Sequence, residues 1–131
     1  MTNADPVLKN CIVWGNTASL MGNQFHLDDV ASDPKIYYSD IQGGVSAFSG
    51  TGAGANYANV YQNNLDVSPS FTSPTTSVGN GTGAAYDALA ANWLIQQGSP
   101  CINIGTPNAS TLGLPVNDLA GKTRVYNGRI D

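Results

Sequence analysis

An apolar position followed by a glycine- or asparagine-rich turn recurs along this chain at nearly constant spacing. The recurrence is marked by Ile12, Ile41, Phe71 and Ile102, which are separated by 29, 30 and 31 residues. Such a period, with one short strand in each unit, is typical of a solenoid whose coils stack, although evenly spaced strands of a β-sandwich would give the same pattern. In a solenoid the four side chains should point inward, and an aspartate in place of Ile102 should unfold the domain.

The residue types favour short strands and turns over helices. The chain lacks glutamate, all nine of its acidic residues are aspartates, and it has 14 Asn, 15 Gly, 11 Ser and 10 Thr. These residues favour turns over helix interiors, which argues against a helical bundle. The apolar content of 41% argues equally against disorder. A length of 131 residues fits one domain, so we expect a single β-rich domain with many turns.

The charge of the chain excludes several classes of partner. The formal net charge is −4 and the sequence pI is near 4.5, which argues against a nucleic-acid partner. No apolar run approaches the roughly 20 residues of a membrane-spanning helix, so we expect no direct membrane insertion. The chain opens without the features of a signal peptide, and we interpret it as a piece of a longer protein. The cations are scattered; they are Lys9, Lys35, Lys122, Arg124 and Arg129.

The two cysteines, Cys11 and Cys101, lie ninety positions apart and do not form the close pairs of a zinc site. They could form a disulfide or remain two buried thiols. If coils stack about 4.8 Å apart, three coil steps would separate them by roughly 14 Å. A disulfide needs Cα atoms within about 7 Å. We therefore expect both thiols to be reduced, buried and slow to react.

The turn residues suggest how the domain is organised. We expect coils over 1–117 and a C-terminal cap over 118–131, within one domain. The segments 44–57 and 73–85 are rich in Gly, Ser and Thr, and they are predicted to be exposed loops that leave the coils. Asn127-Gly128, with Tyr126 before it and Ile130 after it, predicts a two-residue hairpin.

Five ordered motifs carry a resemblance to a known family. They are NCIVWGN from Asn10, YSDIQGG from Tyr38, SPCINIG from Ser99, DLAGKTR from Asp118 and NGRID from Asn127. The series resembles the C-terminal region of bacterial surface and secreted proteins with right-handed parallel β-helix repeats, of the choice-of-anchor Q or polymorphic-outer-membrane-protein-like type. The segment 64–71 is similar to a looser form of that family's Asp-Pro-Leu-Phe step, from which Ser68 and Ser70 depart.

The resemblance implies a fold and a location. The expected fold is all-β: a right-handed parallel β-helix fragment of about four coils with a C-terminal capping hairpin, from a secreted or cell-surface protein. The matched motifs consist of turns, stacked apolar positions and caps. The residues to which a structural role is therefore assigned are Asn10, Cys11, Asn16, Gly43, Gly44, Cys101, Asn103, Asn127 and Gly128.

Two groups of residues suggest chemistry. Asp28, Asp29 and Asp33 form the densest acidic run, and carboxylate oxygens are ligands that calcium prefers. The alternative is a solvated turn with no metal, and no other cofactor is expected. His26 is the sole histidine, and a nucleophile–histidine–acid arrangement would need it, oriented by Asp28 or Asp29 and beside a serine. The chain lacks a Gly-x-Ser-x-Gly elbow, which argues against that catalysis.

The function that these observations favour is a non-catalytic structural or adhesive module. Aromatic rings and amide side chains on a solenoid face suit weak binding of a surface glycan, and a protein partner is equally compatible. An unpaired edge on the first coil predicts end-to-end self-association. The alternative is a carbohydrate-active enzyme module of the polysaccharide lyase type. A cleft that holds clustered carboxylates beside an Arg or Lys would favour the enzyme.

Overall fold

The structure is a computed structural model that describes residues 4–54, 57, 60–75, 91–118 and 120–130, and over these ranges the chain is all-β, without α-helix. Its strands are two to four residues long, because turn-forming residues interrupt each apolar run. The strands are β1 (Val7–Lys9), β2 (Ile12–Val13), β3 (Phe25–His26), β4 (Lys35–Tyr37), β5 (Asp40–Ile41), β6 (Phe48–Ser49), β7 (Tyr61–Gln62), β8 (Phe71–Ser73), β9 (Asn92–Ile95), β10 (Val125–Tyr126) and β11 (Arg129–Ile130). Single 3₁₀ turns are η1 (Gly44–Ala47), η2 (Thr51–Gly54) and η3 (Ala109–Leu112).

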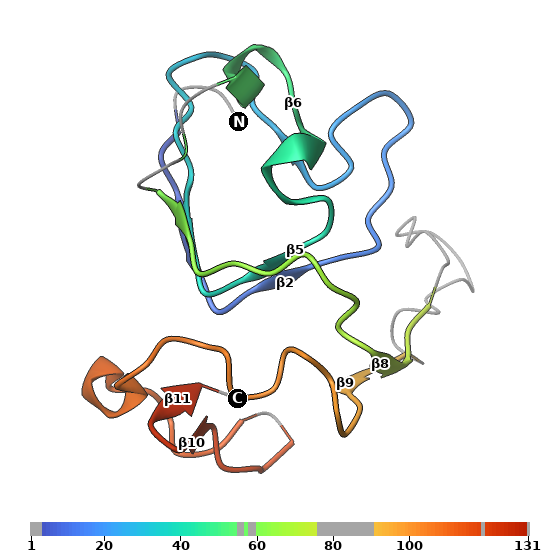
Figure 1. Cartoon of the computed structure of the whole chain (residues 1–131). Coiled ribbons are helices and arrows are strands. Elements are labelled where there is room, and N and C mark those ends of the chain that lie inside the picture. Colours follow the sequence, from blue (N-terminus) through green and yellow to red (C-terminus); the bar gives the residue numbers. More distant parts are fainter. Residues whose placement is uncertain (1–3, 55–56, 58–59, 76–90, 119, 131) are drawn as a thin grey trace.

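In the first half of the chain, successive turns supply equivalent short strands that pair with one another (Figure 1). We call residues 7–26 layer 1, 35–49 layer 2 and 60–67 layer 3. Strands β1, β4 and β7 pair in parallel in that order, β2 pairs with β5, and β3 pairs with β6. An isolated parallel bridge from Asp40 to Leu65 extends the second ladder into layer 3. Three layers thus lie in parallel register.

The corner between the first and second strand of each layer has a left-handed backbone. Asn10, Tyr38 and Asn63 occupy this corner in layers 1, 2 and 3, with φ values of 56°, 51° and 56°. Asparagine tolerates this conformation well, whereas a bulky tyrosine adopts it rarely. Hydrogen bonds continue through the corner: the Asn10 N–H donates to the Tyr37 carbonyl at 3.3 Å, and the Tyr38 N–H to the Gln62 carbonyl at 3.2 Å. The corner therefore repeats with the layers.

Side chains from different layers stack in the interior to form the core. Ile36 pairs with Leu8 on one side and Tyr61 on the other, and it is fully buried. The Phe25 and Phe48 rings lie 4.9 Å apart between centroids because they are register partners of β3 and β6. The buried members of the core are Leu27, Ile36, Ile41, Phe48 and Tyr57. Stacking of like positions thus makes one continuous apolar interior.

The predicted register of inward residues is wrong. Val13, not Ile12, is the register partner of Ile41. Ile12 pairs with Asp40 and is 39% exposed, because successive residues of a strand point to opposite faces. Phe71 lies in β8 and pairs with Ile95 in antiparallel fashion, and Ile102 lies half-buried in a turn. The spacing between paired positions is 28 residues from Val7 to Lys35 and 25 from Ile36 to Tyr61, rather than a constant 30.

The predicted exposed loop at 44–57 is also wrong in part. This segment contains η1, β6 and η2, and β6 pairs with β3 of layer 1. Phe48 and Tyr57 are both buried, and their rings meet edge to face with 5.3 Å between centroids. Small residues appear here because the chain turns tightly around two aromatic anchors, which the Gly and Ser content alone does not reveal. Of the second predicted loop, residues 76–85 lie outside the described residues.

The C-terminal region, residues 91–130, lies beside the layers rather than on top of them (Figure 1). Strand β9 pairs with β8 in antiparallel fashion, and β10 and β11 form the hairpin predicted at Asn127-Gly128. The φ values of Asn127 and Gly128 are 49° and 76°, as a type I′ turn requires. The hairpin is tied back by the Ala109 N–H, which donates to the Gly128 carbonyl at 2.9 Å. The region is thus built from turns and antiparallel pairs.

Candidate functional site

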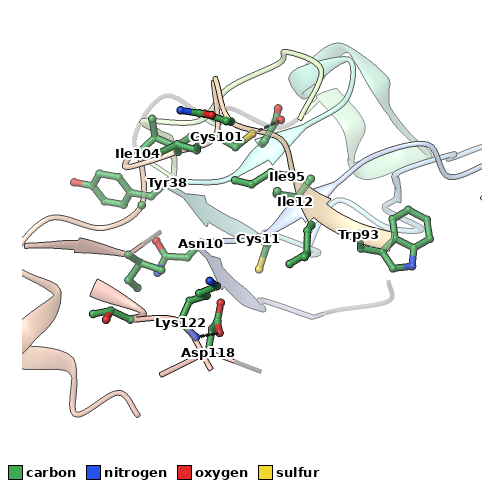
Figure 2. A pocket seen from close by; sticks show the side chains of 17 residues that line it. Asn10, Cys11, Ile12, Tyr38, Trp93, Ile95, Cys101, Ile104, Asp118 and Lys122 are labelled. Carbon is green, nitrogen blue, oxygen red and sulfur yellow. Dashed lines mark hydrogen bonds between the residues drawn. The ribbon is translucent and has the colours of Figure 1, made fainter. Parts of the chain in front are cut away.

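A cavity of about 560 Å³ lies where the C-terminal region meets layers 1 and 2. Its walls come from the corners of the layers, from β9, from the turns after residue 97, and from the C-terminal hairpin region (Figure 2). The apolar part of the wall includes Ile12, Trp93, Leu94, Ile95, Ile102, Ile104 and Ile130. Segments far apart in sequence therefore meet here, which is where ligand sites commonly occur.

One wall of the cavity holds a buried carboxylate beside a thiol. Asp40 is 1% exposed, and its Oδ2 accepts a hydrogen bond from the Cys101 thiol at 3.1 Å. The other oxygen, Oδ1, accepts from the Val67 N–H at 3.2 Å. Burial of Cys101, together with its hydrogen bond and charge interaction with Asp40, raises the pKa of that thiol to about 12. The thiol therefore stays protonated at neutral pH and serves as a donor.

The second cysteine lies in a different environment. Cys11 also lines the cavity but is only half-buried, and its thiol donates to the Lys9 carbonyl at 3.3 Å. Its backbone N–H donates to the Ser39 hydroxyl at 3.2 Å. Both cysteines are free thiols, so the expectation that they are not joined agrees with the structure. The expectation that both are buried is wrong, since Cys101 alone is.

The opposite edge of the cavity is polar. Asp118 and Lys122 lie together there, near Asn10 and Cys11 (Figure 2). The Asp118 Oδ1 accepts from the backbone N–H groups of Ala120 at 2.9 Å and Lys122 at 2.8 Å, which fixes the carboxylate in its turn. The Asn10 Oδ1 accepts from the Thr106 N–H at 2.7 Å and the Thr106 hydroxyl at 2.9 Å. Amide, carboxylate and ammonium groups thus border an apolar chamber.

The acidic run predicted to bind calcium lies away from this cavity. Asp29 Oδ1 accepts from the Ala31 N–H at 2.9 Å and the Ser32 hydroxyl at 3.1 Å, and so closes a local turn. Asp28 has a 64% exposed side chain, and Asp33 uses its backbone N–H to bond Asp5. Within the described ranges no three His, Cys, Asp or Glu side chains are placed to hold a metal ion. The calcium hypothesis therefore gains no support from this geometry.

His26 does meet a serine and an aspartate. Its Nδ1 lies 3.0 Å from the Ser49 Oγ, which follows from the pairing of these two residues in β3 and β6. Its Nε2 lies 3.9 Å from the Asp28 Oδ1, which is beyond hydrogen-bonding distance. The Ser49 hydroxyl also lies 3.4 Å from the Phe25 carbonyl oxygen, as a donor to it. We interpret the group as a polar contact between paired strands, because the 3.9 Å between His26 Nε2 and Asp28 Oδ1 is longer than the hydrogen bond that orients the histidine of a catalytic triad.

Most of the residues to which a structural role was assigned occupy turns. Asn103 has a left-handed φ of 59°, and Gly43 and Gly44 have φ values of 78° and 55°. A Cβ at Gly43 would lie 2.6 Å from the Ala47 Cβ, and the positive φ of Gly43 would strain any other residue. Both the close contact and the backbone conformation therefore require glycine here. Asn16 is exposed and donates from its amide nitrogen to Gln24 Oε1 at 2.8 Å. Asn103, Gly43 and Gly44 thus lie at turns with a left-handed backbone.

Sequence reasoning assigned structural roles to Asn10, Cys11 and Cys101 but missed the other residues that define the cavity. Asp40 lies within the YSDIQGG motif between Ser39 and Ile41, and nothing in that motif indicates that its carboxylate is buried. Lys122 carried no signal beyond its charge. Trp93 follows a segment outside the described residues, and nothing local indicates that it borders a cavity with Ile12. The site depends on contacts between distant segments.

Comparisons with known proteins identify no relative: no family model, curated protein or solved structure matches the chain. None of the helices in the described ranges has the length and apolar character needed to cross a membrane.

Proposed function

We propose that the chain is part of a right-handed parallel β-helix and that it serves as a rigid, non-catalytic structural or adhesive module of a secreted or cell-surface bacterial protein. The observation that carries this proposal is the parallel ladder of β1, β4 and β7, with a left-handed corner repeated in every layer. The described residues contain three layers rather than the four expected from the spacing. Each layer buries its apolar residues against the next, as the coils of a solenoid do.

The adhesive role is supported by exposed aromatic and amide groups. Trp93 is 46% exposed and borders the cavity, as does the exposed amide side chain of Gln97. Rings of this kind stack on sugars, and neighbouring amides hydrogen-bond the hydroxyl groups. We expect glycan binding to be weak and independent of His26, because His26 lies in β3 and does not border the cavity.

The enzyme alternative has one observation in its favour and two against it. The cavity holds Asp40 and Asp118 with Lys122, which are the residue types of a lyase site. However, both oxygens of Asp40 accept hydrogen bonds from the protein, and its 1% exposure excludes a bulky substrate. Asp118 is fixed by turn amides. The scaffold is therefore the better-supported function.

A polysaccharide panel tests the proposal. Uronate-containing and neutral polysaccharides would be incubated with the chain and calcium, and unsaturated ends and reducing sugars would be measured. We expect no turnover. Turnover that Asp28→Asn, Lys35→Ala or Lys122→Ala abolishes would overturn the scaffold in favour of the lyase, and would also show which of the two acidic regions is responsible.

Self-association through the layer 1 edge is part of the same proposal. Within the described residues β1 and β2 each pair on one side alone, and Val7 on this edge is 58% exposed. Unpaired strand edges with apolar side chains associate readily. Sedimentation should show a concentration-dependent dimer, and Val7→Lys should reduce it. A strict monomer at high concentration would contradict this part of the proposal.

A further inference from the structure

We propose that the cavity between the layers and the C-terminal region binds a neutral sugar of one or two pyranose rings. This inference rests on the proposed adhesive function and names its binding site and ligand class. A pyranose has an apolar face of C–H groups and a rim of hydroxyl groups. The cavity offers the complement of both, since an apolar wall faces a polar edge in one chamber.

The apolar wall contains an aromatic ring in a fixed orientation. Trp93 borders the cavity, is 46% exposed and meets Phe71 at an interplanar angle of 88° with 5.3 Å between ring centroids. This edge-to-face contact holds the indole before a ligand arrives, so little side-chain entropy is lost on binding. Ile12 and Leu94, which are 39% and 57% exposed, lie in the same wall. Three partly exposed apolar side chains therefore gather at one site.

The polar edge favours hydroxyl groups over a charged ligand. Lys122 and Asp118 have opposite charges and lie at the same edge, so neither an anion nor a cation is selected by net charge. Asp40 is 1% exposed and both of its oxygens accept hydrogen bonds from the protein, so it offers little surface to a ligand. The Asn10 amide nitrogen adds a donor, since its oxygen already accepts from Thr106, and the Gln97 amide adds a donor and an acceptor. Mixed donors and acceptors of this kind match sugar hydroxyls.

The size of the cavity suits a short saccharide. Its volume of about 560 Å³ lies within the range of roughly 300–1,000 Å³ that small-molecule sites occupy. This volume accommodates one or two pyranose rings.

The fluorescence emission of Trp93 can report binding at this cavity. The chain has two tryptophans, and Trp14 does not line the cavity, so a Trp14→Phe variant reports Trp93 alone. We would titrate this variant with cellobiose, maltose and chitobiose and follow the emission, with calorimetry on the unmodified chain. At least one disaccharide should give a saturable change. Trp93→Ala should lower the affinity about tenfold, and Lys122→Ala and Asp118→Asn about two- to fivefold each.

Controls separate this site from other sugar contacts. Tyr126→Ala removes an aromatic side chain that is 56% exposed but lies outside the cavity, and it should leave the affinity unchanged. Binding that only Tyr126→Ala weakens would overturn the cavity site and leave the adhesive function standing. No disaccharide binding, with saturable binding of decanoate or anilinonaphthalene sulfonate instead, would assign an apolar ligand and overturn the proposal. Because Lys122→Ala changes an exposed residue, misfolding would not obscure the result.

Discussion

The two halves of the molecule are stabilised in different ways. In residues 4–75 most strands pair in parallel with an equivalent strand of the next layer, and the core of five buried apolar residues lies entirely here. In residues 91–130 the β10–β11 hairpin is antiparallel, β9 pairs in antiparallel fashion with β8, and the buried apolar residues are Cys101 and Ala109. The first region therefore depends on apolar burial, and the second depends mainly on hydrogen bonds.

Those hydrogen bonds attach the C-terminal region to particular points of the layers. The Ser99 hydroxyl donates to the Pro69 carbonyl at 2.7 Å, Cys101 donates to Asp40, and Thr106 donates to Asn10. Each of these contacts contributes on the order of 1 kcal/mol, whereas a buried apolar side chain contributes about 1.5–3 kcal/mol. We therefore expect the C-terminal region to open before the layers do, and the predictions below test this difference.

The largest effect should come from a charge in the layered core. Ile36→Asp places a carboxylate between Leu8 and Tyr61 at a fully buried position. The substitution should cost about 5 kcal/mol or more and unfold the whole chain, as measured by circular dichroism and denaturant titration.

Ile102→Asp is the matched change in the C-terminal region. Ile102 is half-buried in a turn and borders the cavity, so an aspartate there keeps contact with water. We expect a loss of about 1 kcal/mol and a chain that still folds. Equal destabilisation by the two substitutions would show that both regions share one core.

Some of this difference could be predicted from the sequence and some could not. The Asn127-Gly128 hairpin and the left-handed Asn10 corner follow from local backbone preferences. The Tyr38 corner has no such signal, because its conformation is imposed by the layers above and below. The layer register failed because Ile12 and Val13 are both apolar, and only long-range pairing decides which one points inward.

The position of the C-terminal region depends on contacts that no local pattern encodes. The Thr106–Asn10 contact joins residues 96 positions apart, and the Cys101–Asp40 contact joins residues 61 apart. The constant spacing predicted that residues near Ile102 would continue the stack. The chain instead leaves the layers after Pro69 and returns along their outer face, so the cavity could not be predicted.

The second-largest effect concerns alkaline pH. The pKa of Cys101 is raised from 9.0 to about 12, so the protonated thiol stabilises the folded state fully below pH 9. This contribution should fall as the pH rises from about 9 to about 12, by roughly 2–3 kcal/mol at pH 11. Cys101→Ser keeps a donor for Asp40 but does not titrate in this range, so it should lose less stability.

Two tyrosines of the core, the buried Tyr57 and the half-buried Tyr61, require a control in that experiment. Burial raises the pKa values of Tyr57 and Tyr61, and their contributions are lost at alkaline pH in the same direction. Both remain in Cys101→Ser, so the difference between the two proteins isolates Cys101. Urea titrations at pH 8 and pH 11 measure it. Identical losses in the two proteins would mean that the layered core alone controls alkaline stability.

A smaller effect is expected at the corner that contacts the C-terminal region. Asn10→Gly keeps the left-handed backbone but removes the oxygen that accepts from Thr106, at a cost of about 1–2 kcal/mol. Asn63→Gly changes the same corner in layer 3, where the side chain is exposed, and should stay within about 0.5 kcal/mol. Hydrogen exchange should show faster opening of the C-terminal region in Asn10→Gly alone. Comparable opening in both variants would mean that the backbone of the corner, and not the Asn10–Thr106 contact, controls how fast the C-terminal region opens.

The smallest expected effect is the difference in stability between alanine substitutions at two glycines with different backbone conformations. A Cβ at Gly128 or at Gly54 would meet nothing within 4 Å, but Gly128 has a φ of 76° in the hairpin turn, whereas Gly54 ends η2 without a positive φ. Gly128→Ala should therefore cost about 1 kcal/mol, while Gly54→Ala should be neutral or slightly stabilising. Because β10 and β11 contact η3, Gly105 and Pro107 of the C-terminal region, the Gly128→Ala loss should appear as faster exchange in the hairpin, with the unfolding midpoint of the layers unchanged. A shift of that midpoint would show that the hairpin and the layers unfold as one unit.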